Sequence, residues 1–169
     1  TEAEAATSAT AIVNRVKSLL GSATSQLGIV VDLDLRPEGK NGPMSRTIES
    51  HREYAQRWAS TWERQAAVRA RPIGEGSLAD SARALFDELA YGGVSESDVR
   101  DIRLLKARME NERLPRGIEP ARHVKLGPGG LTDVEWTIQL IQMRAGMTNP
   151  ALRTPSTTQA ILSAREHEL

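Results

Sequence analysis

Residues 131–146 read LTDVEWTIQLIQMRAG, and the spacing of their apolar residues decides how the chain is expected to fold. At about 100° per residue, this segment forms a helix with two apolar stripes on roughly opposite sides. One stripe consists of Val134, Ile138, Ile141 and Ala145. The other consists of Trp136, Leu140, Met143 and Met147. Such a helix has to pack between two layers, so we expect it at the centre of a helical domain.

Helical spacing predicts further elements on both sides of this central helix. They cover residues 11–21, 45–71, 77–91, 95–113 and 155–169. Capping boxes are expected where Ser or Thr precedes an acid by three residues. These pairs are Ser77 with Asp80 and Thr132 with Glu135.

The overall composition excludes several classes of function. Among 169 residues, Lys plus Arg equals Asp plus Glu at 22 each, so no net charge favours nucleic acid or an anionic membrane. The absence of cysteine rules out disulfides and thiol catalysis, and it fits the reducing cytoplasm. No apolar run approaches the roughly 18 residues that cross a bilayer. Because the first residue is Thr1 rather than Met, we expect a piece of a longer protein.

Residues 29–36, IVVDLDLR, alternate in a way that predicts a β-strand. Asp32, Asp34 and Arg36 would share one face of this strand, because side chains alternate between faces. Two neighbouring carboxylates do not fit a buried face without a counter-ion. The acidic face therefore either lies open to water or meets a cation.

Gly21-Ser22 precedes Asp32 and Asp34 at a spacing that resembles the signature of polymerase-β-like nucleotidyltransferases. In that superfamily a Gly-Ser turn grips phosphate and two strand carboxylates bind magnesium, which neutralises charge during nucleotidyl transfer. Gly21, however, ends an expected helix, where carbonyl groups rather than N–H groups are free. We favour a capping glycine before a surface loop, and we keep a complete minimal nucleotidyltransferase as an alternative.

Three separate segments resemble the glutamine synthetase adenylyltransferases, bifunctional bacterial enzymes that attach AMP to glutamine synthetase and remove it. They are VDLDLRPEGKNG (31–42), TWERQAAVRARPIGE (61–75) and VKLGPGGLTDVEWTIQLIQM (124–143). NPALRTPSTTQAI (149–161) also fits. TWERQAAVRAR, in the second segment, and GLTDVEW, in the third, look more like the C-terminal half of actinobacterial members.

The resemblance implies an α+β fold that is mainly α, with part of a polymerase-β-like nucleotidyltransferase sheet followed by a helical bundle. Residues 1–73 would be the C-terminal part of the nucleotidyltransferase domain, with a helix, a strand and a long helix. Residues 74–169 would be the helical bundle. The family's first two carboxylates have no match before residue 29, so we expect a fragment that is inactive in isolation.

The function implied by the resemblance is transfer of AMP from ATP to a tyrosine of glutamine synthetase, with Mg²⁺ as cofactor. The parent would be a multifunctional, cytoplasmic enzyme of nitrogen metabolism that binds glutamine synthetase and responds to a PII-type signal protein. Two alternatives remain. The chain could come from the deadenylylating half of the same enzyme, or it could be a non-catalytic docking or regulatory module.

The family motif assigns Asp32 as a metal-binding carboxylate and hence as the catalytic residue. Asp34 falls on a position that the motif does not fix, and it is kept as a second candidate metal ligand. Arg36, Arg69 and Lys125 are the candidate nucleotide-binding residues. Arg36 could instead pair with Asp34 in a structural ion pair.

Two further features have both a structural and a functional interpretation. Arg69 and Arg71 lie two positions apart near a helix end, so only one of them is expected to face a cleft.

The run GPGG (127–130) precedes a helix, as in phosphate-binding loops. Acids in the first helical turn oppose an anion, so we interpret the glycines as a turn. The resemblance implies that Asp133 and Glu135 shape the active-site floor through Arg or Lys partners, with Lys125 as a candidate.

Overall fold

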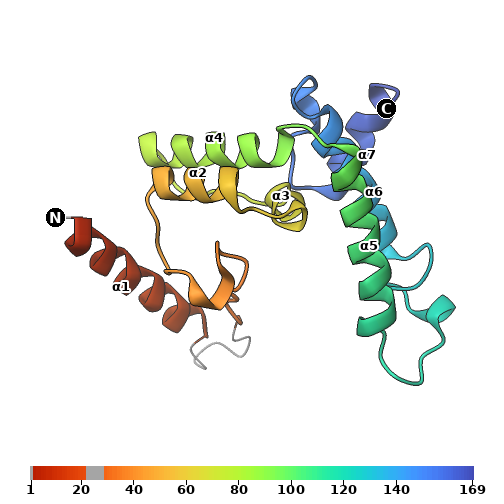
Figure 1. Ribbon diagram of the computed structural model, residues 1–169, viewed down its shortest axis with the longest axis horizontal. Coiled ribbons are helices and arrows are strands. Elements are labelled where there is room, and N and C mark those ends of the chain that lie inside the picture. Colours follow the sequence, from red (N-terminus) through yellow and green to blue (C-terminus); the bar gives the residue numbers. More distant parts are fainter. Residues whose placement is uncertain (1, 22–28) are drawn as a thin grey trace. The chain divides into compact units, whose positions relative to one another are not determined.

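A computed structural model describes residues 2–21 and 29–169 of the chain (Figure 1). Every regular element in these residues is helical. The chain divides into two compact units, Thr1–Ala59 and Ser60–Leu169, called unit 1 and unit 2 below. The domain boundary expected after residue 73 stays a prediction about the whole protein.

Unit 1 contains helix α1 (Glu2–Gly21), the 3-10 turn η1 (Gly39–Asn41) and helix α2 (Ile48–Arg57). The expected helix over 11–21 is confirmed as part of the longer α1. Tyr54 of α2 is buried, and the guanidinium carbon of Arg46 lies 5.6 Å from the centre of its ring. This stacked arginine ties the segment before α2 to the helix itself.

The predicted β-strand over residues 29–36 is wrong, and with it the predicted sheet. Residues 29–33 are irregular and form no ladder with any described residue, and a turn begins at Asp34. A strand needs a neighbour to satisfy its backbone groups, and alternation along one segment cannot supply one. Ile29 and Leu35, on the apolar side of the segment, are 58% and 70% exposed, so that side is not buried as in a sheet either. The described fold is all-α rather than α+β.

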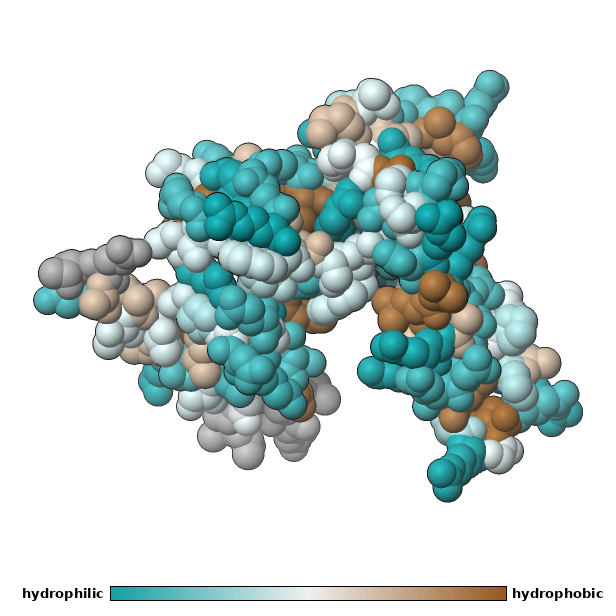
Figure 2. All heavy atoms as spheres, viewed as in Figure 1, coloured by the Kyte–Doolittle hydropathy of each residue, from teal (hydrophilic) through white to brown (hydrophobic). Residues whose placement is uncertain are grey.

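Unit 2 is a helical bundle, which confirms the mainly helical prediction. Its helices are α3 (Thr61–Ala67), α4 (Ser77–Tyr91), α5 (Glu96–Arg113), α6 (Leu131–Ala145) and α7 (Thr157–Glu166), with 3-10 turns η2 (Pro120–Arg122) and η3 (Pro150–Leu152). Within the described ranges, no helix combines the length and the apolar character that crossing a membrane requires. The face drawn in Figure 2 is largely hydrophilic, with separate hydrophobic patches.

Helix α6 packs on two sides, as its two apolar stripes predict. It contacts α3 and α4 as well as α7. Met143, with Trp136 and Leu140, belongs to a first core, which also contains Ala67, Val68, Ala90, Tyr91 and Ile102. Ile138, with Ile141 and Ala145, belongs to a second core, which also contains Leu152, Ala160 and Ala164. Only the end members of the stripes, Val134 and Met147, are largely exposed, at 44% and 53%.

The single long helix predicted over residues 45–71 is wrong. Helix α2 ends at Arg57 and α3 begins at Thr61. Ser60 and Glu63 form a capping box, in which the Ser60 N–H donates to Glu63 Oε2 at 2.8 Å. This box defines a new helix start, so the aromatic residues at spacing four continue across a break.

The two predicted capping boxes are also wrong. The N-cap residues of α4 and α6 are Gly76 and Gly130, which have no capping side chain. The acids expected to close the boxes bond elsewhere: Asp80 pairs with Arg83, and Glu135 pairs with Arg69. Ion pairs with arginine have displaced these local caps.

We expect Met143→Ala to lower the free energy of unfolding by about 2–5 kcal/mol, because it leaves a cavity in a fully buried site. The matched control, Met147→Ala, removes the same atoms from an exposed position and should change stability by less than about 0.5 kcal/mol. Urea denaturation followed by circular dichroism measures both. Equal effects would contradict the central position of α6.

Candidate functional site

Arg36 organises the loop 29–42, which carries the predicted catalytic and metal-binding residues. Its guanidinium donates hydrogen bonds to three carbonyl oxygens, those of Leu33 (2.7 Å), Lys40 (3.1 Å) and Gly42 (3.0 Å). A planar guanidinium has five N–H donors, so one side chain can bind all three carbonyls. Arg36 therefore holds the loop closed, and its contact with a nucleotide stays a prediction.

The two carboxylates of this loop are both exposed and have separate local partners. Asp32 Oδ1 accepts the backbone N–H of Asp34 at 2.8 Å, which closes a tight turn. Asp34 Oδ2 lies 3.4 Å from Lys40 Nζ. The cation beside Asp34 is therefore Lys40 rather than Arg36. Both carboxylates are thus open to water, and that of Asp34 also meets a cation.

Asp32 and Asp34 do not by themselves fit a magnesium ion. Mg²⁺ prefers six oxygen ligands in near-ideal octahedral geometry. No group of three or more His, Cys, Asp or Glu residues in the described ranges is arranged to hold a metal. The two metal-ligand assignments stay predictions, and a magnesium site here would need further ligands. Of the expected Gly-Ser turn, Gly21 ends α1, and Ser22 lies outside the described residues.

The backbone of the loop explains the spacing of its two glycines. Gly39 has a left-handed conformation (φ 57°), which favours glycine. Glu38 directly before it is also left-handed (φ 64°), and its carboxylate lies 2.9 Å from Arg46 Nη2. A Cβ atom on Gly42 would lie 2.0 Å from the Pro37 carbonyl oxygen, so only glycine fits there. The motif around Asp32 therefore encodes the shape of the loop as well as its charges.

The N-terminal turn of α6 holds the acids that were expected to shape an active-site floor. Asp133 Oδ2 accepts the backbone N–H of Gly129 at 2.5 Å. Lys106, on α5, pairs with both Asp133 and Glu110. The Lys106 ammonium, followed by the Gly129 N–H, lowers the pKa of Asp133 below its ordinary value. The glycine run is thus a turn, as predicted, and one of its N–H groups is already occupied by a protein carboxylate.

Lys106 is a residue that the sequence interpretation missed. The expected partner, Lys125, has an exposed side chain, while its backbone carbonyl accepts the Thr132 N–H at 3.0 Å. Burial alone would lower the pKa of Lys106, but hydrogen bonds to Asp133 and Glu110 raise it above the ordinary value. No local sequence signal could identify the Lys106–Asp133 pair, because Lys106 lies on α5 and Asp133 on α6. The nucleotide-binding role of Lys125 stays a prediction.

Arg69 joins three parts of unit 2. Its guanidinium donates to Glu135 Oε1 at 2.8 Å, to Thr157 Oγ1 at 2.7 Å, and to the Pro155 carbonyl. These contacts connect the end of α3 with α6 and with the start of α7. Arg71 has no ion pair among the described residues. Of the two arginines, Arg69 thus has a structural role, and its predicted contact with a nucleotide is untested.

Comparisons with known proteins agree on one family. The family model described as glutamate-ammonia ligase adenylyltransferase matches residues 1–85. Relatives named bifunctional glutamine synthetase adenylyltransferase/adenylyl-removing enzyme match almost the whole chain. The protein from Cutibacterium acnes is 48% identical over 156 residues, which cover 90% of this chain and 16% of the relative.

Two other relatives with the same name give similar values. The protein from Streptomyces coelicolor is 46% identical over 168 residues, covering 98% of this chain and 17% of the relative. The protein from Mycobacterium tuberculosis H37Rv is 44% identical over 163 residues, covering 95% and 16%. The chain therefore spans about a sixth of the length of the curated relatives that it matches.

We expect Arg69→Gln to lower the free energy of unfolding by about 1–2 kcal/mol, because hydrogen bonds from a charged group to three segments are lost. The matched control is Arg71→Gln, which removes the same charge two positions away and should leave stability nearly unchanged. Urea denaturation measures both variants. A larger loss with Arg71→Gln than with Arg69→Gln would refute the structural role.

The lowered pKa of Asp133 predicts a pH-dependent contribution to stability. A carboxyl group with a lowered folded-state pKa stabilises above its unfolded value, about 3.9, and this stabilisation is lost as pH falls through the folded-state pKa. Asp133→Asn should therefore be less stable than the wild type at neutral pH, with the difference shrinking in acid. Denaturation at a series of pH values measures this.

The control for this experiment is Glu75→Gln, which neutralises an exposed carboxylate with no ion pair among the described residues. It should show little difference from the wild type at any pH. A stability difference for Asp133→Asn that stays constant from neutral to acidic pH would contradict the role of its charge.

Proposed function

Because the chain belongs to the glutamate-ammonia ligase adenylyltransferase family, we propose that it is part of an enzyme that transfers AMP from ATP to a tyrosine of glutamine synthetase. The observation that carries this proposal is the high identity along nearly the whole chain, including the loop 29–42. In the proposed reaction, the tyrosine oxygen forms a bond to the α-phosphorus of ATP. The bond from that phosphorus to the β-phosphate oxygen breaks, and pyrophosphate leaves.

Asp32 is the residue that we propose for the active site. It lies in a loop whose backbone is held by Arg36, so its carboxylate has a defined position relative to the neighbouring residues. Preorganised carboxylates suit nucleotidyl transfer because their position costs little to fix at the moment of reaction. Asp32 would contribute one ligand to a magnesium site completed by other residues, and Arg36 or Lys125 would contact phosphate oxygens.

Removal of AMP is the second candidate activity, because the relatives are named for both activities. In that direction, inorganic phosphate would attack the AMP–tyrosine linkage and release ADP. The resemblance to the C-terminal half of actinobacterial members favours attachment. A third candidate is a non-catalytic module in which unit 2 docks on glutamine synthetase. Response to a PII-type protein and a cytoplasmic location belong to the proposal for the whole enzyme.

We expect Asp32→Asn, in a full-length protein that contains this chain, to lower kcat for AMP attachment by more than about 100-fold, because a metal-binding charge is lost. Incorporation of radiolabelled AMP from ATP into glutamine synthetase measures the rate. Asp34→Asn is the matched control in the same loop and should lower kcat by less than about tenfold.

Three results would argue against this assignment. Unchanged activity of Asp32→Asn would remove Asp32 from the site. A greater loss with Asp34→Asn than with Asp32→Asn would favour the minimal nucleotidyltransferase instead. AMP transfer by the 169-residue chain alone at the full rate would contradict the dependence on further residues.

Release of ADP from adenylylated glutamine synthetase after addition of phosphate distinguishes removal from attachment.

A further inference from the structure

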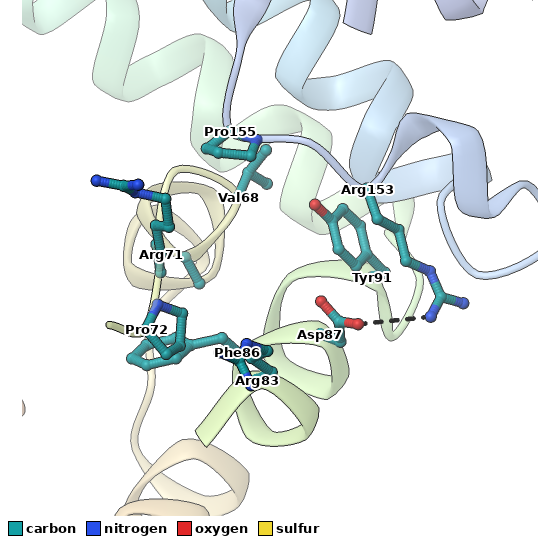
Figure 3. A pocket seen from close by; sticks show the side chains of 11 residues that line it. Val68, Arg71, Pro72, Arg83, Phe86, Asp87, Tyr91, Arg153 and Pro155 are labelled. Carbon is teal, nitrogen blue, oxygen red and sulfur yellow. Dashed lines mark ion pairs between the residues drawn. The ribbon is translucent and has the colours of Figure 1, made fainter. Parts of the chain in front are cut away.

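Unit 2 contains a pocket of about 260 Å³ that none of the predicted site residues lines (Figure 3). It lies between the end of α3, the C-terminal part of α4 and the segment that leads into α7. Its apolar walls are formed by Ala67, Val68, Ala70, Pro72, Phe86 and Pro155. Its polar lining is formed by Arg71, Arg83, Asp87, Tyr91 and Arg153. The pocket thus combines a small apolar wall with an unusual number of charged groups.

Tyr91 is the most informative residue of this pocket. Its side chain is only 4% exposed, and Figure 3 shows its hydroxyl pointing toward the side of the pocket where Val68 and Pro155 lie. No described residue forms a hydrogen bond with this hydroxyl. The hydroxyl oxygen itself is not fully buried, because among the described residues only Arg46 Nε is a buried polar atom without a partner. It is therefore accessible from the pocket, and a ligand there could accept its hydrogen bond.

The protonation state of Tyr91 defines what kind of partner fits. Burial, and then the nearby charge of Asp87, raise the pKa of Tyr91 above its ordinary value, although Arg153 opposes this. The hydroxyl therefore keeps its proton at neutral pH and can donate it in a hydrogen bond. A group with an exposed oxygen lone pair is the matching acceptor.

The charges around the pocket add up to an excess of positive charge. Asp87 is paired with Arg153, whose Nη1 lies 3.5 Å from the carboxylate (Figure 3). Arg83 is paired with Asp80 at 2.7 Å, outside the pocket lining. Arg71 has no such ion pair in the part of the chain that the structure describes. Its side chain is exposed and forms part of the pocket lining.

We propose that this pocket binds a small anion carrying a carboxylate or phosphate group, with the Tyr91 hydroxyl as hydrogen-bond donor and Arg71 as counter-ion. The volume is below the roughly 300–1,000 Å³ of typical sites for drug-sized ligands, so the ligand is small. Its non-polar part would pack against Phe86 and Pro72. This inference is independent of AMP transfer, since it rests only on residues of unit 2.

The test is a titration of the full chain with sodium phosphate and, separately, with sodium acetate, at constant ionic strength in sodium chloride. Backbone amide NMR shifts of residues 68–72 and 87–91 report binding. We expect saturable shifts with at least one anion. Saturation with phosphate alone identifies a phosphate-bearing ligand, and saturation with acetate alone identifies a carboxylate-bearing one.

Two variants examine the proposed contacts. Tyr91→Phe, which keeps the packed ring, and Arg71→Gln should each weaken binding by about fivefold or more, since each removes one hydrogen-bonding or charged partner. Arg116→Gln is the control, because Arg116 is another exposed arginine of unit 2 with no ion pair among the described residues. It should bind like the wild type.

Either of two results would overturn the proposal. Shifts that stay linear in anion concentration for both salts would mean that the pocket has no site. Equal weakening by Arg116→Gln and Arg71→Gln would mean a general response to net charge. Because Arg71 is exposed and outside both cores, its variant gives a clear answer even if Tyr91→Phe perturbs the packing.

Discussion

The requirement to bury both sides of α6 determines the arrangement of unit 2. A helix with one apolar side can lie on a surface, but α6 has to be covered twice, by α3 and α4 and by α7. Two glutamines of this helix, Gln139 and Gln142, are also buried, and each has a partner. Gln139 accepts a hydrogen bond from Gln65 Nε2 at 2.8 Å, and Gln142 donates to the Leu152 carbonyl at 2.6 Å. Since buried amides without partners are costly, these bonds select one register for the helices around α6.

The acidic residues at the start of α6 extend the same arrangement to the surface. Asp133 is bound by Lys106 from α5, and Glu135 is bound by Arg69 from the end of α3. Each pair joins α6 to a different neighbour. The family-like segment 124–143 therefore has a structural explanation, in which its acids position helices, that is independent of any ligand.

The sequence predicted what depends on periodicity along one segment and failed where distant residues decide. The two stripes of α6 follow from its own residues, and both cores formed where they indicated. Ser60 and Glu63 have the spacing of a capping box and so indicate the break before α3. The aromatic residues at spacing four on both sides of the break favoured one continuous helix instead. The strand at 29–36 failed because its alternation says nothing about a partner. Likewise, spacing alone could not decide which of Arg69 and Arg71 is bound internally.

The hydrogen bonds from Arg36 to the backbone of its loop have a consequence for which side chains the loop can accept. The guanidinium contacts only main-chain oxygens, and every amino acid supplies such an oxygen. Related chains can therefore exchange the side chains at positions 33 and 40 and keep the same curve of backbone around Asp32. Position 42 is different, since any side chain there would collide with the Pro37 carbonyl. Substitutions in this loop can thus change the side chains beside Asp32, while Arg36 and Gly42 preserve the conformation of the backbone.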